Sequence, residues 1–133
     1  MSALELWAAE VEDLFGVSCR FQCETPVLIH DVAMATHLYH IAQEAVNNAI
    51  KHGAPRKVLI QLSAGQGRGT LLIKDDGKGI AENPANTQGM GLHIMNYRAG
   101  VIGGTLEARR DTPRGTIVSC TFPVRDSGGY AHD

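Results

Sequence analysis

Two pairs of short strand patterns, each joined by a short loop, constrain the fold of this chain more than any other feature. The first pair covers residues 57–64 and 70–75, on either side of a glycine-rich loop at 65–69. The second pair covers residues 105–110 and 116–124. Strands joined by short loops pair antiparallel, whereas consecutive parallel strands need a longer crossover between them. The pattern therefore argues against a doubly wound parallel sheet.

Helical patterns alternate with these strands. Apolar residues recur at three- and four-residue steps in three segments, and each pattern ends at a glycine. Amphipathic helices are thus predicted at residues 3–15, 32–52 and 92–102. A β-branched and aromatic stretch at 17–23 predicts one further strand. The order helix, strand, helix, hairpin, helix, hairpin predicts an α+β two-layer sandwich.

Length and composition predict a single globular domain. A chain of 133 residues with 44% hydrophobic and 20% charged residues is typical of one compact domain. This domain is expected to cover residues 1–125, with an amino-terminal helix and strand in 1–30 and the glycine-rich and polar motifs in 31–125. Residues 126–133 are polar and contain glycine, so a flexible tail is expected there.

The charge balance and the cysteines exclude several classes of function. Twelve Lys and Arg against fourteen Asp and Glu give a net charge of −2, which argues against a nucleic-acid-binding surface. No apolar run approaches the roughly 18 to 20 residues of a membrane span, so no direct membrane contact is expected of this domain. Cys19 and Cys23 lack a second ligand pair for zinc, and the odd set of three cysteines predicts reduced thiols and a cytoplasmic location.

One flank of the predicted helix at 32–52 carries a polar stripe. His40, Glu44, Asn48 and His52 follow one another at four-residue steps beside the apolar face. A carboxylate and an amide oxygen one turn apart, at Glu44 and Asn48, suit a Mg²⁺ ion with its waters and a phosphate. Taken alone, Asn48 and His52 fit better as surface or capping residues near the helix end. The absence of an H-E-x-x-H pattern argues against zinc.

A predicted strand runs into an Asp-Gly turn within residues 71–80. Asp75 stands at the end of this strand, and Gly77 and Gly79 permit backbone conformations and close approaches that other residues do not. A buried carboxylate in this place can accept a hydrogen bond from the exocyclic amine of adenine, where guanine carries an oxygen. By itself, the Asp-Gly pair is only a turn signal.

A second glycine pair, Gly89 and Gly91, opens the predicted helix at Leu92. Backbone N–H groups at a helix start form an anion site, and the glycines belong neither to a P-loop nor to a dinucleotide-binding fingerprint. Residues 81–89 fit a lid over a ligand and an ordinary surface loop equally well. The Thr116 hydroxyl, at the start of the last strand, is expected to reach the same pocket through a water.

Four motifs in order carry a resemblance to a known family. They are Gln-Glu-Ala-Val-Asn-Asn-Ala-Ile-Lys-His at 43–52, Asp-Asp-Gly-Lys-Gly at 75–79, Gly-Met-Gly-Leu at 89–92 and Gly-Thr at 115–116. With them, the chain resembles the ATP-binding domain of bacterial two-component sensor histidine kinases, within the superfamily of gyrase, Hsp90 and MutL. The resemblance implies a Bergerat-type sandwich with a mixed, mostly antiparallel sheet and helices on one face.

The resemblance also implies roles for individual residues. Asn48 would bind the Mg²⁺ that bridges the phosphates, and Asp75 would bind the adenine amine. Gly77 and Gly79 would form the turn beside the adenine, and Gly89 and Gly91 would contact the phosphates. The full set of implied ATP-binding residues is Asn48, Lys51, His52, Asp75, Gly77, Gly79, Ile80, Gly89, Met90, Gly91, Leu92 and Thr116. Glu44 occupies the position at which hydrolysing relatives carry their general base, so Glu44 and Asn48 are the implied catalytic residues.

The function that the resemblance implies is binding of Mg-ATP and donation of the γ-phosphoryl group to a histidine on a separate dimerisation domain. The short lid and the motif at 43–52 most resemble the NarL-type sensor kinases, whose partner response regulators usually contain a helix-turn-helix. No histidine lies in a phosphoacceptor context, so the chain resembles an excised catalytic domain of a parent protein that is either free or membrane-anchored. The helix at 3–15 is expected to follow the dimerisation helix and to have its apolar face covered by a neighbouring domain.

Two other functions stay open at this point. A hydrolytic ATPase clamp of the same superfamily would use Glu44 to activate water. A nucleotide-sensing module without chemistry would bind ATP independently of Mg²⁺. Arg98 is interpreted as a packing residue, as are Cys19, Cys23 and His30.

Overall fold

The computed structural model describes residues 2–23, 32–78, 92–111 and 114–124. The elements in chain order are α1 (Ser2–Phe15), β1 (Ser18–Gln22), α2 (Val32–Asn48), a π-helical turn η1 (Ala49–Gly53), β2 (Lys57–Gly65), β3 (Arg68–Asp75), α3 (Leu92–Val101), β4 (Thr105–Arg110) and β5 (Thr116–Pro123). The predicted order of helices and strands is confirmed. No helix in the described ranges is long and apolar enough to cross a membrane.

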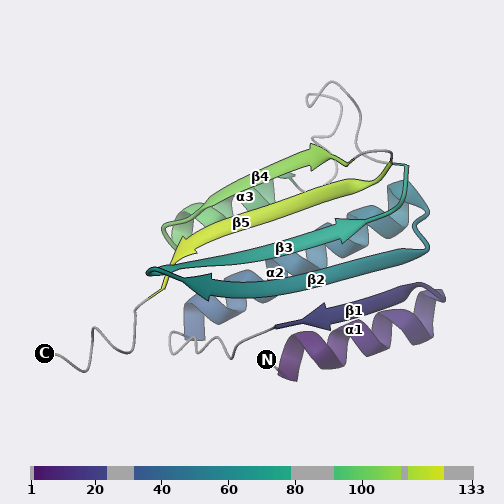
Figure 1. The fold of residues 1–133 in the computed structure, drawn as a ribbon, viewed down its shortest axis with the longest axis horizontal. Coiled ribbons are helices and arrows are strands. Elements are labelled where there is room, and N and C mark those ends of the chain that lie inside the picture. The colour runs from purple at the N-terminus through teal and green to yellow at the C-terminus, as the bar shows by residue number, and fades with distance from the viewer. Residues whose placement is uncertain (1, 24–31, 79–91, 112–113, 125–133) are drawn as a thin grey trace, which may run out of the picture.

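The five strands form one sheet in the order β1-β2-β3-β5-β4. Strand β1 runs parallel to β2, and every other neighbouring pair is antiparallel. Figure 1 shows the sheet in front, with α2 and α3 behind it and α1 beside β1. This arrangement confirms the predicted α+β sandwich with a mixed, mostly antiparallel sheet and helices on one face.

One hydrophobic core lies between the sheet and the helices. Buried strand residues of the inner face alternate with half-buried or exposed ones, and they meet the apolar stripes of all three helices. The largest side chains in this core with less than 2% exposure include Phe122, Leu4, Ile41, Ile60 and Met95. Helix α1 also contacts α2, where the rings of Trp7 and Tyr39 pack edge to face with centroids 6.2 Å apart.

The inner face of α1 is buried by the domain itself. Leu4, Ala8 and Val11 belong to the same core as the sheet residues. The expectation that a neighbouring domain covers the apolar face of this helix is therefore wrong for these residues, because β1 and the core already remove them from water. Leu14 and Phe15, at the end of the helix, are 75% and 52% exposed.

The first hairpin turn is tighter than the predicted loop at 65–69. Strand β2 ends at Gly65 and β3 begins at Arg68, so only Gln66 and Gly67 form the turn. Both have positive φ values, 56° and 78°, as a two-residue turn matched to the twist of a hairpin requires. Gly69 then continues the strand, where a Cβ atom would lie 2.5 Å from the ring of Phe122. This glycine serves close packing and not a loop.

The end of the long helix also differs from the prediction of a regular helix up to residue 52, closed by Gly53. The α-helix stops at Asn48, a single π-helical turn covers Ala49–Gly53, and the left-handed residue is Ala54 with φ 48°. Gly53 instead serves a tertiary contact, because its carbonyl oxygen accepts a hydrogen bond from the Lys78 N–H at 2.9 Å. Wide turns of this kind are frequent at functional sites.

Candidate functional site

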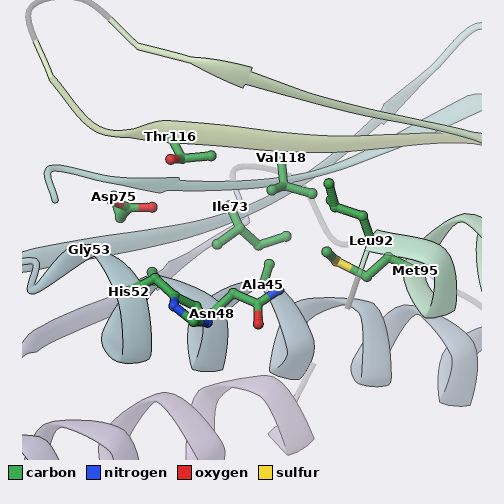
Figure 2. A pocket seen from close by; sticks show the side chains of 11 residues that line it. Ala45, Asn48, His52, Gly53, Ile73, Asp75, Leu92, Met95, Thr116 and Val118 are labelled. Carbon is green, nitrogen blue, oxygen red and sulfur yellow. The ribbon is translucent and has the colours of Figure 1, made fainter. Parts of the chain in front are cut away.

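A pocket opens between the helices and the sheet (Figure 2). Its lining residues come from α2 and η1, from β3, from the start of α3 and from β5. They are Ala45, Asn48, Ala49, His52, Gly53, Ile73, Asp75, Leu92, Met95, Thr116 and Val118. The structure thus brings together five of the residues singled out in the sequence, namely Asn48, His52, Asp75, Leu92 and Thr116.

Asp75 is a buried carboxylate at the end of β3, with 6% of its surface exposed. Its Oδ1 atom accepts a hydrogen bond from the Gly77 N–H at 2.8 Å, and the Thr116 backbone provides a second one. Burial raises the pKa of Asp75 above its ordinary value, because desolvation outweighs these hydrogen bonds, and the negative charges of Asp76 and Asp111 act in the same direction. A carboxylate has about four acceptor positions, so Asp75 keeps acceptor capacity for a ligand amine.

Asp76 fixes the turn that follows β3. Its Oδ1 atom accepts hydrogen bonds from the backbone N–H groups of Arg56 at 2.8 Å and Lys57 at 2.9 Å. The Lys57 amide is the main reason why the pKa of Asp76 is lowered, and the positive charge of Arg114 contributes. This role was not predicted from the sequence. The available signal is the doublet Asp75-Asp76, since adjacent residues at a strand end point in different directions.

Arg114 and three glycines complete the frame around Asp75. The Arg114 Nε–H donates to the Gly77 carbonyl oxygen at 3.0 Å. A Cβ atom on Gly77 would lie 2.6 Å from the Gly53 carbonyl oxygen, so the π-helical turn and the turn after β3 approach this closely only because Gly77 has no side chain. Gly115 has φ 108°, and a Cβ atom there would overlap the Asp75 carbonyl oxygen. No motif in the sequence indicates Arg114.

Apart from Asp75 and Thr116, the walls that the sheet and α3 provide are apolar. Ile73, Met95 and Val118 face it from the sheet and α3, and at most 6% of each is exposed. Apolar surfaces beside one buried polar group suit a flat aromatic ligand with a hydrogen-bonding edge. The sequence does not distinguish these three residues from ordinary core residues, because their spacing is the same as that of any buried strand or helix position.

The polar stripe of the long helix divides in the structure. Asn48 and His52 line the pocket, with Asn48 half-buried and His52 exposed. His40 instead lies 3.0 Å from Gln43, between Nδ1 and Oε1. Glu44 is half-buried and Lys51 is exposed, and neither is a lining residue.

The oxygen atoms at the pocket wall fit a Mg²⁺ ion that a bound ligand holds for the most part. Among the described residues, no three His, Cys, Asp or Glu side chains gather into a group that could hold a metal ion. Asn48 offers one amide oxygen at the pocket wall, and Mg²⁺ at nucleotide sites is commonly held by one or two protein oxygens together with phosphates and waters.

Several predicted site residues lie outside the described ranges. These are Gly79, Ile80, Gly89, Met90 and Gly91, together with the predicted lid at 81–89. Leu92, which follows them, is the first residue of α3. The described part of the site is therefore the half around Asp75 and the end of the long helix.

Sequence comparison finds a family and several relatives. Residues 33–126 match the family model described as histidine kinase-, DNA gyrase B-, and HSP90-like ATPase. The chain is 36% identical over 123 residues to the nitrate/nitrite sensor protein NarQ of Escherichia coli K12, in a match that covers 91% of this chain and 22% of the relative. It is 32% identical over 120 residues to NarX, a nitrate/nitrite sensor protein of the same strain, covering 90% and 20%. The chain thus spans about a fifth of the length of these relatives.

Solved structures support the same fold. The histidine kinase domain of the blue-light activated histidine kinase of Erythrobacter litoralis EL346 superposes with a TM-score of 0.78 at 24% identity, covering 92% of this chain and 60% of that one. The ATP binding domain of PrrB from Mycobacterium tuberculosis gives a TM-score of 0.75 at 19% identity, covering 94% and 93%.

Proposed function

Because the chain belongs to the family of histidine kinase-, DNA gyrase B- and HSP90-like ATPases, we propose that it binds Mg-ATP in the pocket around Asp75 and donates the γ-phosphoryl group to a histidine on a separate dimerisation domain. The observation that carries this proposal is the buried Asp75 carboxylate among apolar walls, in a chain whose relatives include the sensor proteins NarQ and NarX. The transfer to histidine itself rests on that family relation.

The adenine ring is assigned to the inner half of the pocket. Asp75 accepts a hydrogen bond from the exocyclic amine, while Ile73, Met95 and Val118 pack on the ring faces. Guanine would place an oxygen against the carboxylate, which leaves two acceptors facing each other and a lost hydrogen bond. The Thr116 side chain lies in the same pocket and is assigned to a water beside Asp75.

The phosphates are assigned to the end of the long helix and the segment before α3. Asn48 would hold the Mg²⁺ ion, and Lys51 and His52 would lie near the phosphates. The amides of Gly89 to Gly91 would bind the phosphates. Gly79 is assigned with Gly77 to the turn beside the adenine, and Ile80 is assigned to the ATP-binding residues. The ion neutralises phosphate charge when bound. The residues of the chain contribute by positioning, since phosphoryl transfer asks for little covalent chemistry from a protein. Glu44 is assigned to orienting or deprotonating the attacking imidazole.

The partners we propose are a dimerisation domain with the phosphoacceptor histidine, elsewhere in the parent protein, and a response regulator of the helix-turn-helix type. We propose a cytoplasmic location for this domain, where ATP is available. The chain spans about a fifth of the length of its sensor relatives. An assay of this chain therefore includes a separate dimerisation domain that carries the phosphoacceptor histidine.

Phosphotransfer from γ-labelled ATP tests this function. We expect label to appear on an added dimerisation domain in an acid-labile form, to require Mg²⁺ and to be absent from a dimerisation domain whose histidine is replaced. Steady phosphate release by this domain alone would favour the hydrolytic clamp. ATP binding that is unchanged by Mg²⁺, with no transfer, would favour a sensing module without chemistry.

A further inference from the structure

A hydrogen bond joins the two helices that border the pocket. The Arg98 Nη1 atom on α3 lies 3.1 Å from the His37 Nδ1 atom on α2, and both side chains are half-buried. The two residues are separated by 61 positions in the chain. From the sequence, Arg98 is expected only to pack, and this contact gives it a specific partner instead.

The chemistry of this contact defines which ring nitrogen of His37 carries the proton. A guanidinium group has only donors, so Nδ1 of His37 must be the acceptor. Nδ1 is then unprotonated, and the ring proton is on Nε2. A doubly protonated imidazolium would have no acceptor and would place a second positive charge next to Arg98. The contact therefore selects the neutral Nε2–H tautomer of His37.

Both helices connect this contact to the pocket. On α3, Arg98 stands three residues after Met95, which lines the pocket, and helix positions three apart lie on the same face. On α2, Asn48 lies eleven residues after His37, which returns it to nearly the same side of the helix at about 100° per residue. Figure 2 shows Met95 and Leu92 on α3 and Ala45 and Asn48 on α2 bordering one pocket.

We propose that His37 and Arg98 are positioning residues for the nucleotide. Their hydrogen bond fixes α3 relative to α2, and so holds Leu92 and Met95 at the place where they pack on the bound purine ring. Neither His37 nor Arg98 lines the pocket, so they act through these neighbours. This role rests on the proposed nucleotide function. It adds that His37 and Arg98 set the spacing between α2 and α3, and so the width of the nucleotide pocket.

Calorimetry with Mg²⁺ and a non-hydrolysable ATP analogue tests the pair. Arg98→Met and His37→Phe each remove one partner while keeping the bulk of the side chain. We expect each to weaken binding roughly tenfold, the equivalent of one hydrogen bond, and the double variant to bind no more weakly than either single variant. His37→Asn keeps an acceptor at the position of Nδ1 and is expected to restore most of the affinity. Arg68→Met, at the exposed start of β3, is the matched control with unchanged affinity.

Unchanged affinity in Arg98→Met, or additive losses in the double variant, would overturn the positioning role while the unmodified domain still binds. Failure of the unmodified domain to bind would overturn the proposed function, and this role with it. Each variant is first checked for a cooperative melt, so that affinity refers to folded protein.

Nitrogen-15 spectra of the imidazole rings provide a measurement that does not depend on stability. At a pH where His37 is neutral, its Nδ1 resonance is expected at the position of an unprotonated acceptor, and the Arg98→Met variant is expected to populate both tautomers. An Nδ1–H tautomer in the unmodified domain would contradict the hydrogen bond and overturn the proposal.

Discussion

Asp75 and Asp76 are neighbours in sequence with opposite environments. The pKa of Asp75 is raised, mainly by burial, whereas the pKa of Asp76 is lowered, mainly by the Lys57 amide. Ionisation of Asp75 therefore opposes folding, and ionisation of Asp76 favours it. From the sequence, Asp75 could be predicted as a site residue because its carboxylate ends an apolar strand just before a turn with two glycines. The role of Asp76 could not, because its partners at Arg56 and Lys57 are about twenty residues away along the chain.

Replacing Asp75 is expected to separate stability from binding. In Asp75→Asn, the side-chain oxygen still accepts from Gly77 and the buried charge is gone, but one of the two acceptor oxygens beside Gly77 and Thr116 becomes a donor. These two effects on stability oppose each other, so the melting temperature of the nucleotide-free domain is expected to change little. The amide can no longer be a pure acceptor toward the adenine amine, so affinity for the ATP analogue should fall by a factor of about 10 to 100. Calorimetry and thermal denaturation measure the two effects. Asp13→Asn, on the exposed side of α1, is the matched control, and unaltered affinity in Asp75→Asn would reject its assigned role.

The opposite pKa shifts of Asp75 and Asp76 also predict opposite dependences of folding stability on pH. Stability due to the raised pKa of Asp75 is present below its unfolded value of about 3.9 and is lost as the pH rises through the folded pKa. Stability due to the lowered pKa of Asp76 is present above about 3.9 and is lost as the pH falls through the folded pKa. Urea denaturation at a series of acidic pH values should therefore show a shallower acid-side loss in Asp76→Asn than in the unmodified domain. Equal slopes would contradict the role of Asp76.

At the scale of elements, the helices and strands could be predicted to within a few residues from the spacing of apolar residues and from the glycines at the ends of the patterns. Their ends could not. The tight turn at Gln66 and Gly67 needs a non-glycine residue with positive φ, which the sequence does not signal. The π-helical turn at the end of the long helix contacts the turn after β3, where Gly53 meets Gly77, and no local pattern records a contact between residues about 24 positions apart.

Three glycines are expected to respond differently to substitution. Gly77→Ala would place a Cβ atom 2.6 Å from the Gly53 carbonyl oxygen, so both the turn and nucleotide binding should be lost. Gly67→Ala has open space around it but a φ of 78°, and should cost only about 1 to 2 kcal/mol of unfolding free energy with binding intact. Gly65→Ala, in open space without a positive φ, should be nearly neutral. Denaturation and calorimetry on the three variants measure this order, and tight binding by Gly77→Ala would refute the close contact.

At the scale of the whole molecule, the pocket lies between elements that are far apart along the chain, from α2 to β5. Its walls come from α2, η1, β3, α3 and β5, so a bound ligand contacts both helices behind the sheet and two of its central strands at once. The sequence indicates the polar residues of this pocket but not the apolar ones, because Ile73, Met95 and Val118 carry no chemical signal beyond hydrophobicity.

Binding at such a junction is expected to stabilise the entire domain. A ligand present at about 100 times its dissociation constant adds roughly 2.7 kcal/mol to the unfolding free energy, which should raise the melting temperature by several degrees. Mg-ATP is expected to produce this shift, Mg-GTP at the same concentration a much smaller one, and the Asp75→Asn variant almost none. Equal shifts with both nucleotides would argue against selection of adenine by Asp75.

The contact between Trp7 and Tyr39 allows tryptophan fluorescence to follow the amino-terminal helix separately from the rest of the domain. The chain contains one tryptophan, and it lies where α1 meets α2, away from the residues that line the pocket. Its fluorescence emission therefore tracks detachment of the first helix, while circular dichroism follows the secondary structure as a whole. If the emission maximum moves to longer wavelength at a lower temperature than the ellipticity change, the first helix leaves the core before the sheet melts.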